Sequence, residues 1–184
     1  MRHNGKISTI EKWLKYAVLE ALSHMVKILF VCWGNICRSP MCEFVFRDII
    51  KKAGREREFM AESAATSDEE IWNGIGNPVY PPAAAKLSEA GIDCSGKRAR
   101  RMQKSDYDRY DLLVGMEDLN LRYMKKICGG DPDHKIVRLM DFTDRPGNVS
   151  DPWYTRDFDT CWKDVEEGCT GLWNYLIKKT DPIL

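Results

Sequence analysis

A chain of 184 residues has the size of one compact domain with a short appended segment. Its residues are 43% hydrophobic, 10% aromatic and 30% charged, which excludes disordered, collagen-like and low-complexity chains and fits a globular protein. The 28 Lys and Arg residues equal the 28 Asp and Glu residues in number, so no net charge draws the chain to nucleic acid. Because the longest apolar run, Ile28 to Trp33, is too short to cross a bilayer, we expect no membrane insertion.

The first predicted element is an amphipathic helix over residues 8–23. Ser8 and Glu11 have the spacing of a capping box, and apolar residues then recur at the helical period. This N-terminal helical extension, residues 1–24, fits packing on its own domain. Its four basic residues against two acidic ones also permit docking on a membrane surface or a partner. Met25 stands directly before the next element and is a candidate for the natural start.

The domain over residues 25–184 alternates β-rich apolar runs with segments of helical period. The run VKILFVC is typical of a central parallel strand, and Pro40 and Gly54 suit the two ends of the helix that follows. This alternation predicts an α/β fold with a four-stranded parallel sheet and helices on both faces, with ligands at the carboxyl ends of the strands. The predicted strands are Val26–Cys32, Phe59–Ala65, Asp111–Met116 and Lys135–Met140, and the predicted helices are 39–53, Pro82–Ala90, Asp118–Cys128 and a final one from Asp157.

The segment CWGNICRSP, from Cys32 to Pro40, joins the first of these strands to its helix. Gly34 and Asn35 tolerate positive φ, so the chain can curl until its peptide N–H groups converge on one anion. The following helix N-terminus and the Arg38 guanidinium add positive charge, which would bind phosphate and stabilise a thiolate at Cys32, the predicted nucleophile. Chance alone gives about 0.04 C-x5-R-[ST] motifs in such a chain. The predicted phosphate-binding residues are Trp33, Gly34, Asn35, Ile36, Cys37 and Arg38.

The stretch VCWGNICRSP closely resembles the phosphate loop of low-molecular-weight protein tyrosine phosphatases. The resemblance covers about residues 26–178, and it implies the four-stranded parallel sheet of that family, a phosphocysteine intermediate on Cys32, and neither metal nor cofactor. The implied substrate is a phosphotyrosine-containing protein or a small aryl phosphate, with a cognate tyrosine kinase as a candidate partner. The resemblance extends to residues 63–67, to Trp72 through Pro78, to Met116 and Asn120, and to residues 151–154.

Transfer of a phosphoryl group from a phenol to Cys32 needs a proton on the leaving oxygen, and Asp151 is the candidate acid. Pro152 restricts Asp151 to extended conformations, which fixes the direction of the side chain. Trp153 and Tyr154 can hold an aromatic ring between them. We therefore expect Asp151 to protonate the leaving group and then, as a carboxylate, to activate the hydrolytic water. An ordinary turn is the alternative, since Asp-Pro occurs twice more in the chain.

By the same resemblance, Asn35, Ser39 and Ser63 form a hydrogen-bond network that supports the loop. Lys97 stands where the family usually has a histidine in this network, and its ammonium could donate to Ser39 or Asn35. Glu117 stands where the family commonly has aspartate. Five basic residues between 97 and 104 form a solvated face or attract the acidic flanks of a substrate. The implied pocket walls are Trp33, Trp72, Tyr80, Trp153 and Tyr154.

The cysteines argue against a zinc site or a disulfide framework, because they are odd in number and include no C-x-x-C pair. Free thiols without a secretory leader indicate a cytoplasmic protein. Cys37 lies five residues after Cys32, close enough for a disulfide that would protect the nucleophile, although packing alone is the alternative. The remaining five are expected to serve packing: Cys42, Cys94, Cys128, Cys161 and Cys169.

Three other functions compete with phosphotyrosine hydrolysis. A thioredoxin-coupled arsenate reductase needs two further closely spaced cysteines, and Cys94 has no partner before Cys128. A protein-arginine phosphatase of this fold carries threonine where this chain has Ile36, whose apolar side chain favours phosphotyrosine. A non-catalytic phosphate-binding adaptor would not need the intact nucleophile, arginine and acid. The Asp-Pro-Trp-Tyr stretch favours hydrolysis over arsenate reduction.

Overall fold

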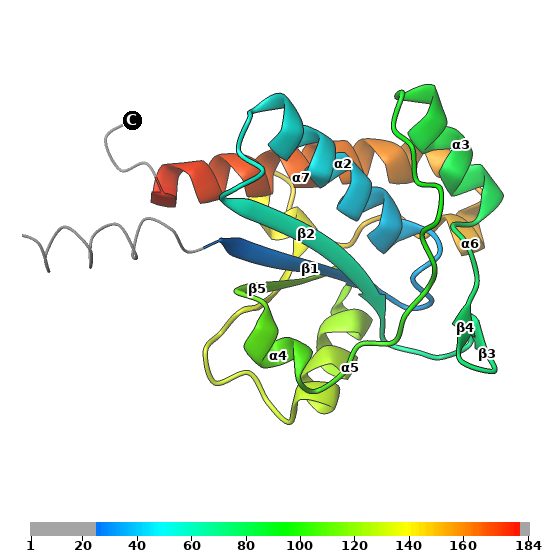
Figure 1. The fold of residues 1–184 in the computed structure, drawn as a ribbon, viewed down its shortest axis with the longest axis horizontal. Helices are drawn as coiled ribbons and strands as arrows, with labels where there is room; N and C mark the ends of the chain where they lie inside the picture. Colours follow the sequence, from blue (N-terminus) through cyan, green and yellow to red (C-terminus); the bar gives the residue numbers. More distant parts are fainter. Residues whose placement is uncertain (1–24, 181–184) are drawn as a thin grey trace, which may run out of the picture.

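The main sheet consists of four parallel strands, β1 (Val26–Cys32), β2 (Phe59–Ala65), β5 (Leu112–Gly115) and β6 (Ile136–Arg138). Their order is β2-β1-β5-β6 (Figure 1). β1 pairs with both β2 and β5, so it is a central strand of the sheet, as its apolar sequence predicts. This computed structural model describes residues 25–180, so the amphipathic helix expected over residues 8–23 lies outside the described residues.

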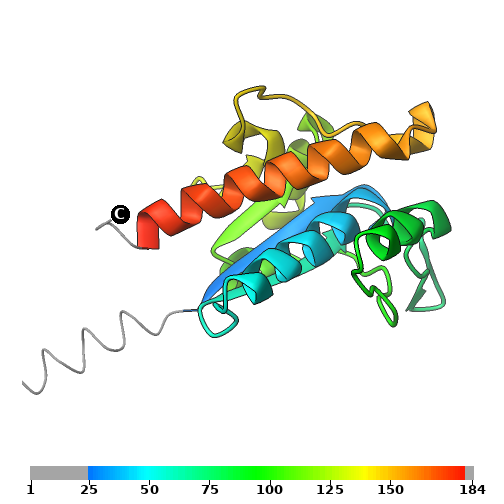
Figure 2. The same cartoon turned by 90° about the horizontal axis from the view of Figure 1, so that it is seen from above.

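Helices cover both faces of the sheet, which confirms the predicted α/β architecture (Figures 1 and 2). The two long helices lie side by side on one face, and two shorter helices lie on the other. None of the helices within the described residues is long and apolar enough to cross a membrane. The first layer contains α2 (Arg38–Lys52), α3 (Pro81–Glu89) and α7 (Phe158–Thr180), and the second contains α4 (Asp106–Arg109) and α5 (Asp118–Cys128).

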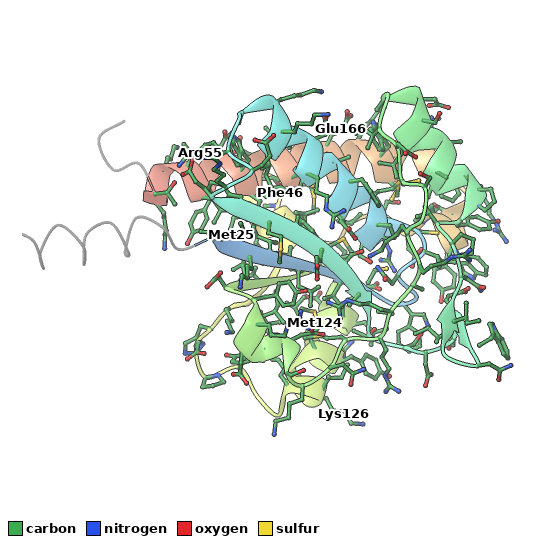
Figure 3. The ribbon with its side chains drawn as sticks, in the orientation of Figure 1. Met25, Phe46, Arg55, Met124, Lys126 and Glu166 are labelled. Carbon is green, nitrogen blue, oxygen red and sulfur yellow. The ribbon has the colours of Figure 1, made fainter. Side chains whose placement is uncertain are left out.

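Alternate residues of β1 enter two separate cores. Ile28 and Phe30 belong to the core beneath α2 and α7, and the Phe30 ring meets Phe46 edge to face at 5.6 Å. Leu29 belongs to the smaller core beneath α5, together with Met124. Figure 3 shows Phe46 and Met124 on opposite sides of the sheet. The two cores hold β1 rigidly, and β1 carries Cys32 at its carboxyl end.

The predicted strand Lys135–Met140 is wrong in its second half. β6 ends at Arg138, and the 3-10 helix η1 (Leu139–Phe142) follows directly. The reason is the length of the neighbouring strand, since β5 ends at Gly115, which pairs with Arg138 and leaves Leu139 no partner. Leu139 instead turns its fully buried side chain into the core beneath α7.

A β-hairpin was missed between β2 and α3. It consists of β3 (Ile71–Trp72) and β4 (Ile75–Gly76), which pair antiparallel. Asn73 and Gly74 form its turn, and both have positive φ, 50° and 78°. Asn-Gly is the residue pair that favours such a two-residue turn, so the signal was present in the sequence. The hairpin lies at the carboxyl end of the main sheet (Figure 1).

The contact between α7 and η1 requires a glycine at position 171. A Cβ atom there would lie 2.2 Å from the backbone oxygen of Phe142, which cannot move without η1. We expect Gly171→Ala to lower the free energy of unfolding by about 1–3 kcal/mol in denaturant titrations. Gly147→Ala is the control, because a Cβ atom at Gly147 meets no atom within 4 Å. Equal effects of the two variants would contradict this account of the helix contact.

Candidate active site

Residues outside the loop between β1 and α2 hold it in place by donating hydrogen bonds to its carbonyl groups. The carbonyl of Cys32 accepts from the Thr66 N–H at 2.9 Å, and that of Ile36 accepts from the Tyr80 N–H at 2.8 Å. Asn35 has a left-handed backbone with φ of 59°, as the predicted curl requires. Within the described residues, the peptide N–H groups of Gly34, Ile36 and Cys37 bond to no protein acceptor. These N–H groups are therefore available to an anion.

Cys32 and the loop that follows it line part of a cavity of about 350 Å³. The thiol is almost fully buried, and its Sγ accepts hydrogen bonds from the Asn35 N–H at 3.2 Å and from the Ser39 hydroxyl at 3.0 Å. Both donors, and the N-terminus of α2, stabilise negative charge on Sγ. This environment suits a nucleophilic thiolate.

Arg38 supplies the positive charge of the cavity from the first position of α2. Its side chain is buried, and Nη2 lies 3.0 Å from Glu117 Oε1 and 2.6 Å from Asp151 Oδ2. Burial alone would lower the pKa of the guanidinium, but the negative charges of Cys32 and the two carboxylates raise it. Nη1 is buried and has no hydrogen-bond partner among the described residues. A phosphate oxygen in the cavity would satisfy Nη1.

Asp151 reaches the cavity from the loop before α6 (Pro152–Thr155). Its backbone is extended, as the following proline predicts, and its Oδ1 accepts from the Trp153 N–H at 2.9 Å. The loop is anchored one residue earlier, where the Ser150 N–H donates to the buried Asp164 Oδ2 at 2.8 Å. The nucleophile, the arginine and the predicted acid thus share one cavity, although 113 positions separate Arg38 from Asp151.

Aromatic side chains form part of the cavity wall, as expected for Trp33, Trp153 and Tyr154. Tyr80 lies behind this wall, with its ring 5.9 Å from that of Trp153. Trp72 does not line the cavity, because it projects from the β3–β4 hairpin and is 70% exposed. The sequence analysis missed three lining residues, Glu69, Glu70 and Leu119. The two glutamates follow the carboxyl end of β2, where a ligand is expected in such sheets.

The network expected around Asn35 is present. Its Nδ2 donates to the hydroxyls of Ser39 at 2.9 Å and Ser63 at 2.8 Å. The expectation that Lys97 donates to Ser39 or Asn35 is wrong. Its Nζ lies 2.7 Å from Oε2 of the buried Glu43, which also accepts from the Ser63 hydroxyl at 2.5 Å. The sequence analysis missed Glu43, whose signal is an acidic residue on the buried face of α2.

All seven cysteines are free. Cys42, Cys161 and Cys169 lie in the core beneath α2 and α7, in agreement with the packing role expected for them. Cys37 is also buried, and burial is the main cause that raises the pKa of its thiol, with a further rise from the charge of Cys32. Within residues 25–180, no three His, Cys, Asp or Glu side chains gather as metal ligands would.

Comparison with known proteins agrees with this geometry. Residues 27–181 match the family described as low molecular weight phosphotyrosine protein phosphatase. The protein-tyrosine-phosphatase YfkJ of Bacillus subtilis (strain 168) is 35% identical over 150 residues, which cover 80% of this chain and 94% of the relative. A Streptomyces coelicolor low molecular weight protein-tyrosine-phosphatase is 36% identical over 153 residues, which cover 79% of this chain and 90% of that one.

Solved structures extend the similarity to three dimensions. The crystal structure of YfkJ superimposes with a TM-score of 0.79 at 34% identity and covers 85% of this chain and 97% of its own. The Streptococcus pyogenes low molecular weight protein tyrosine phosphatase has a TM-score of 0.72 at 36% identity, covering 83% of this chain and 93% of its own. The chain therefore belongs to the low molecular weight phosphotyrosine protein phosphatase family and is a protein-tyrosine phosphatase, a hydrolase of phosphoric monoesters.

Proposed function

We propose that Cys32, Arg38 and Asp151 carry out the hydrolysis of phosphotyrosine. The observation that carries this proposal is the meeting of a hydrogen-bonded thiol, an unpartnered guanidinium nitrogen and a carboxyl group in one cavity. Arg38 and the free N–H groups of the loop bind the phosphate oxygens. Sγ of Cys32 attacks phosphorus, the bond from phosphorus to the tyrosine oxygen breaks, and Asp151 gives that oxygen its proton.

The second step regenerates the thiolate. A water molecule attacks the phosphorus of the phosphocysteine and gives a proton to the Asp151 carboxylate, and the sulfur leaves as inorganic phosphate forms. Asp151 thus returns to its acid form for the next turnover. An incoming phosphate competes with Asp151 for Nη2 of Arg38.

The walls of the cavity support phosphotyrosine as the substrate, in a protein or as a small aryl phosphate. Trp33, Trp153 and Tyr154 offer aromatic surface to a phenyl ring, and Ile36 keeps the lining next to the loop apolar. The relatives compared above are named as protein-tyrosine phosphatases. The arsenate reductase reading finds no support, because Cys128 is buried in the core beneath α5, away from the core that contains Cys32.

The Asn35 network orients the Ser39 hydroxyl toward the nucleophile. The side-chain amide of Asn35 donates both of its hydrogens in hydrogen bonds, one to the Ser39 hydroxyl and one to the Ser63 hydroxyl. Each hydroxyl then has its own hydrogen left for an anion, the sulfur of Cys32 or the carboxylate of Glu43. Lys97 balances the charge of Glu43, so this chain closes the network with an ion pair.

A disulfide between Cys32 and Cys37 is the proposed protection against oxidation. Peroxide converts the Cys32 thiolate to a sulfenic acid, the Cys37 thiolate attacks that sulfur, and hydroxide leaves to form water. Seven free thiols also support a cytoplasmic location, where such a disulfide is reduced again. Because burial raises the pKa of Cys37, the attacking thiolate is scarce at neutral pH.

The nucleophile is tested with p-nitrophenyl phosphate and phosphotyrosyl peptides. Cys32→Ser removes the sulfur that receives the phosphoryl group, so turnover should fall to background. Wild-type activity should persist in EDTA, because Arg38 and the loop N–H groups supply the positive charge. Turnover by the serine variant, or loss of wild-type turnover in EDTA, would refute the thiolate mechanism.

Asp151→Asn tests the general acid. The variant should lose about 10²- to 10⁴-fold in kcat on phosphotyrosine, which is the usual contribution of general acid catalysis. Aryl phosphates whose phenols are more acidic need less protonation, so the loss should shrink as the leaving-group pKa falls. A loss of equal size across a series of aryl phosphates would show that Asp151 is structural.

Cys37→Ala tests the protective disulfide. After mild peroxide, dithiothreitol should restore the wild type but not the variant, each measured against its own untreated sample. Formation of the disulfide should accelerate as pH rises. Because the pKa of Cys37 is raised, its thiol is mostly protonated at neutral pH, and each rise in pH increases the fraction of attacking thiolate. Mass spectrometry of the loop peptide reads the product directly. Sulfinic acid at Cys32 with a free Cys37 in the wild type would assign Cys37 to packing alone.

A further inference from the structure

The mouth of the active-site cavity is acidic, which is unexpected for a site that binds a phosphate dianion. Its lining contains four carboxylates, from Glu69, Glu70, Glu117 and Asp151, against the single cation of Arg38. Glu117 and Asp151 are paired with Arg38. Among residues 25–180, neither Glu69 nor Glu70 has a cationic side chain within 4.0 Å. Two uncompensated negative charges therefore face the entrance.

Both glutamates are held against the phosphate loop. Glu69 accepts a hydrogen bond from the Trp33 indole N–H at 2.7 Å. Glu70 accepts from Asn77 Nδ2 at 2.7 Å, and its Cγ lies 2.9 Å from where a Cβ atom of Gly34 would be. Each of these bonds uses one carboxylate oxygen, so each carboxylate has a second oxygen for a ligand. The pair forms a fixed acidic wall beside the loop.

None of the five basic residues between 97 and 104 lies within 4.0 Å of the Glu69 or Glu70 carboxylate, and three of the five pair with other carboxylates. A basic run engaged in this way within the fold offers little to the acidic flanks of a substrate. The expectation that the run attracts acidic flanks therefore finds no support in these contacts. The three ion pairs are Lys97 with Glu43, Arg100 with Asp106, and Arg101 with Asp68.

We propose that Glu69 and Glu70 select phosphotyrosine that is flanked by lysine or arginine. The inference rests on the proposed function, since phosphotyrosine in the cavity places its neighbouring residues at the mouth. A basic flank would bring the charge that the acidic wall lacks, whereas an acidic flank would meet repulsion. Sequence context thereby determines which phosphotyrosines are hydrolysed fastest.

The test uses three phosphotyrosyl peptides that differ only in the two residues beside phosphotyrosine, which are arginine, alanine or glutamate. Wild-type kcat/KM should fall in that order, by about 3- to 10-fold at each step, and the differences should shrink as salt rises. In the Glu69→Gln, Glu70→Gln double variant the ratio of the arginine to the glutamate peptide should approach one. A ratio within one protein is unaffected by a general loss of activity.

Glu166→Gln is the matched control, since Glu166 is an exposed glutamate of α7 that does not line the cavity (Figure 3). It should keep the wild-type ratio. Equal kcat/KM for the three peptides, or a ratio that survives in the double variant, overturns the role of the acidic wall. Failure of the wild type to hydrolyse p-nitrophenyl phosphate would instead overturn the proposed function.

Discussion

The buried guanidinium of Arg38 is the charge around which the active site is assembled. A cation that is shut away from water must be paired, and Arg38 receives Glu117 from the start of α5 and Asp151 from the loop before α6. Three segments that are distant in sequence therefore meet at the carboxyl end of the sheet. The same pairing that satisfies the cation brings the predicted acid beside the nucleophile. The ion pairs of Arg38 thus both compensate its buried charge and position the predicted acid.

A second constraint sets the shape of the phosphate loop. Several of its carbonyl groups accept hydrogen bonds from residues outside the loop, and several of its N–H groups have no protein acceptor among the described residues. The loop carbonyls accept hydrogen bonds from the backbone N–H groups of Thr66, Ser67 and Tyr80. The side chain of Asn35 donates to the Ser63 hydroxyl and so links the loop to β2. The loop is preorganised for an anion before any anion arrives, so little reorganisation is needed when phosphate enters. The buried Glu43–Lys97 pair completes this support from the side of α2.

Much of this arrangement follows from local sequence. The bounds of β1, β2 and α5 match the predicted ones, because long apolar runs and strong helix ends are local signals. The prediction of a strand through Met140 is wrong because the length of that strand depends on β5. The prediction of the Lys97 partner is wrong because the actual partner, Glu43, lies 54 positions away in the sequence. The resemblance predicted Trp72 in the pocket wall, whereas the structure places it on the β3–β4 hairpin with 70% of its surface exposed. Contacts between segments that are distant in sequence cannot be predicted from the local sequence pattern.

The β3–β4 hairpin and the residues before it form an excursion between β2 and α3, outside the four-stranded sheet. The acidic wall belongs to this excursion, whereas Cys32 belongs to β1 and Arg38 to α2. Substitutions at the exposed positions of the excursion, such as Glu69, alter the surface that meets a substrate without removing a residue of either hydrophobic core. Duplicated genes for such a protein could therefore acquire different target proteins in few mutational steps while every copy keeps the same reaction.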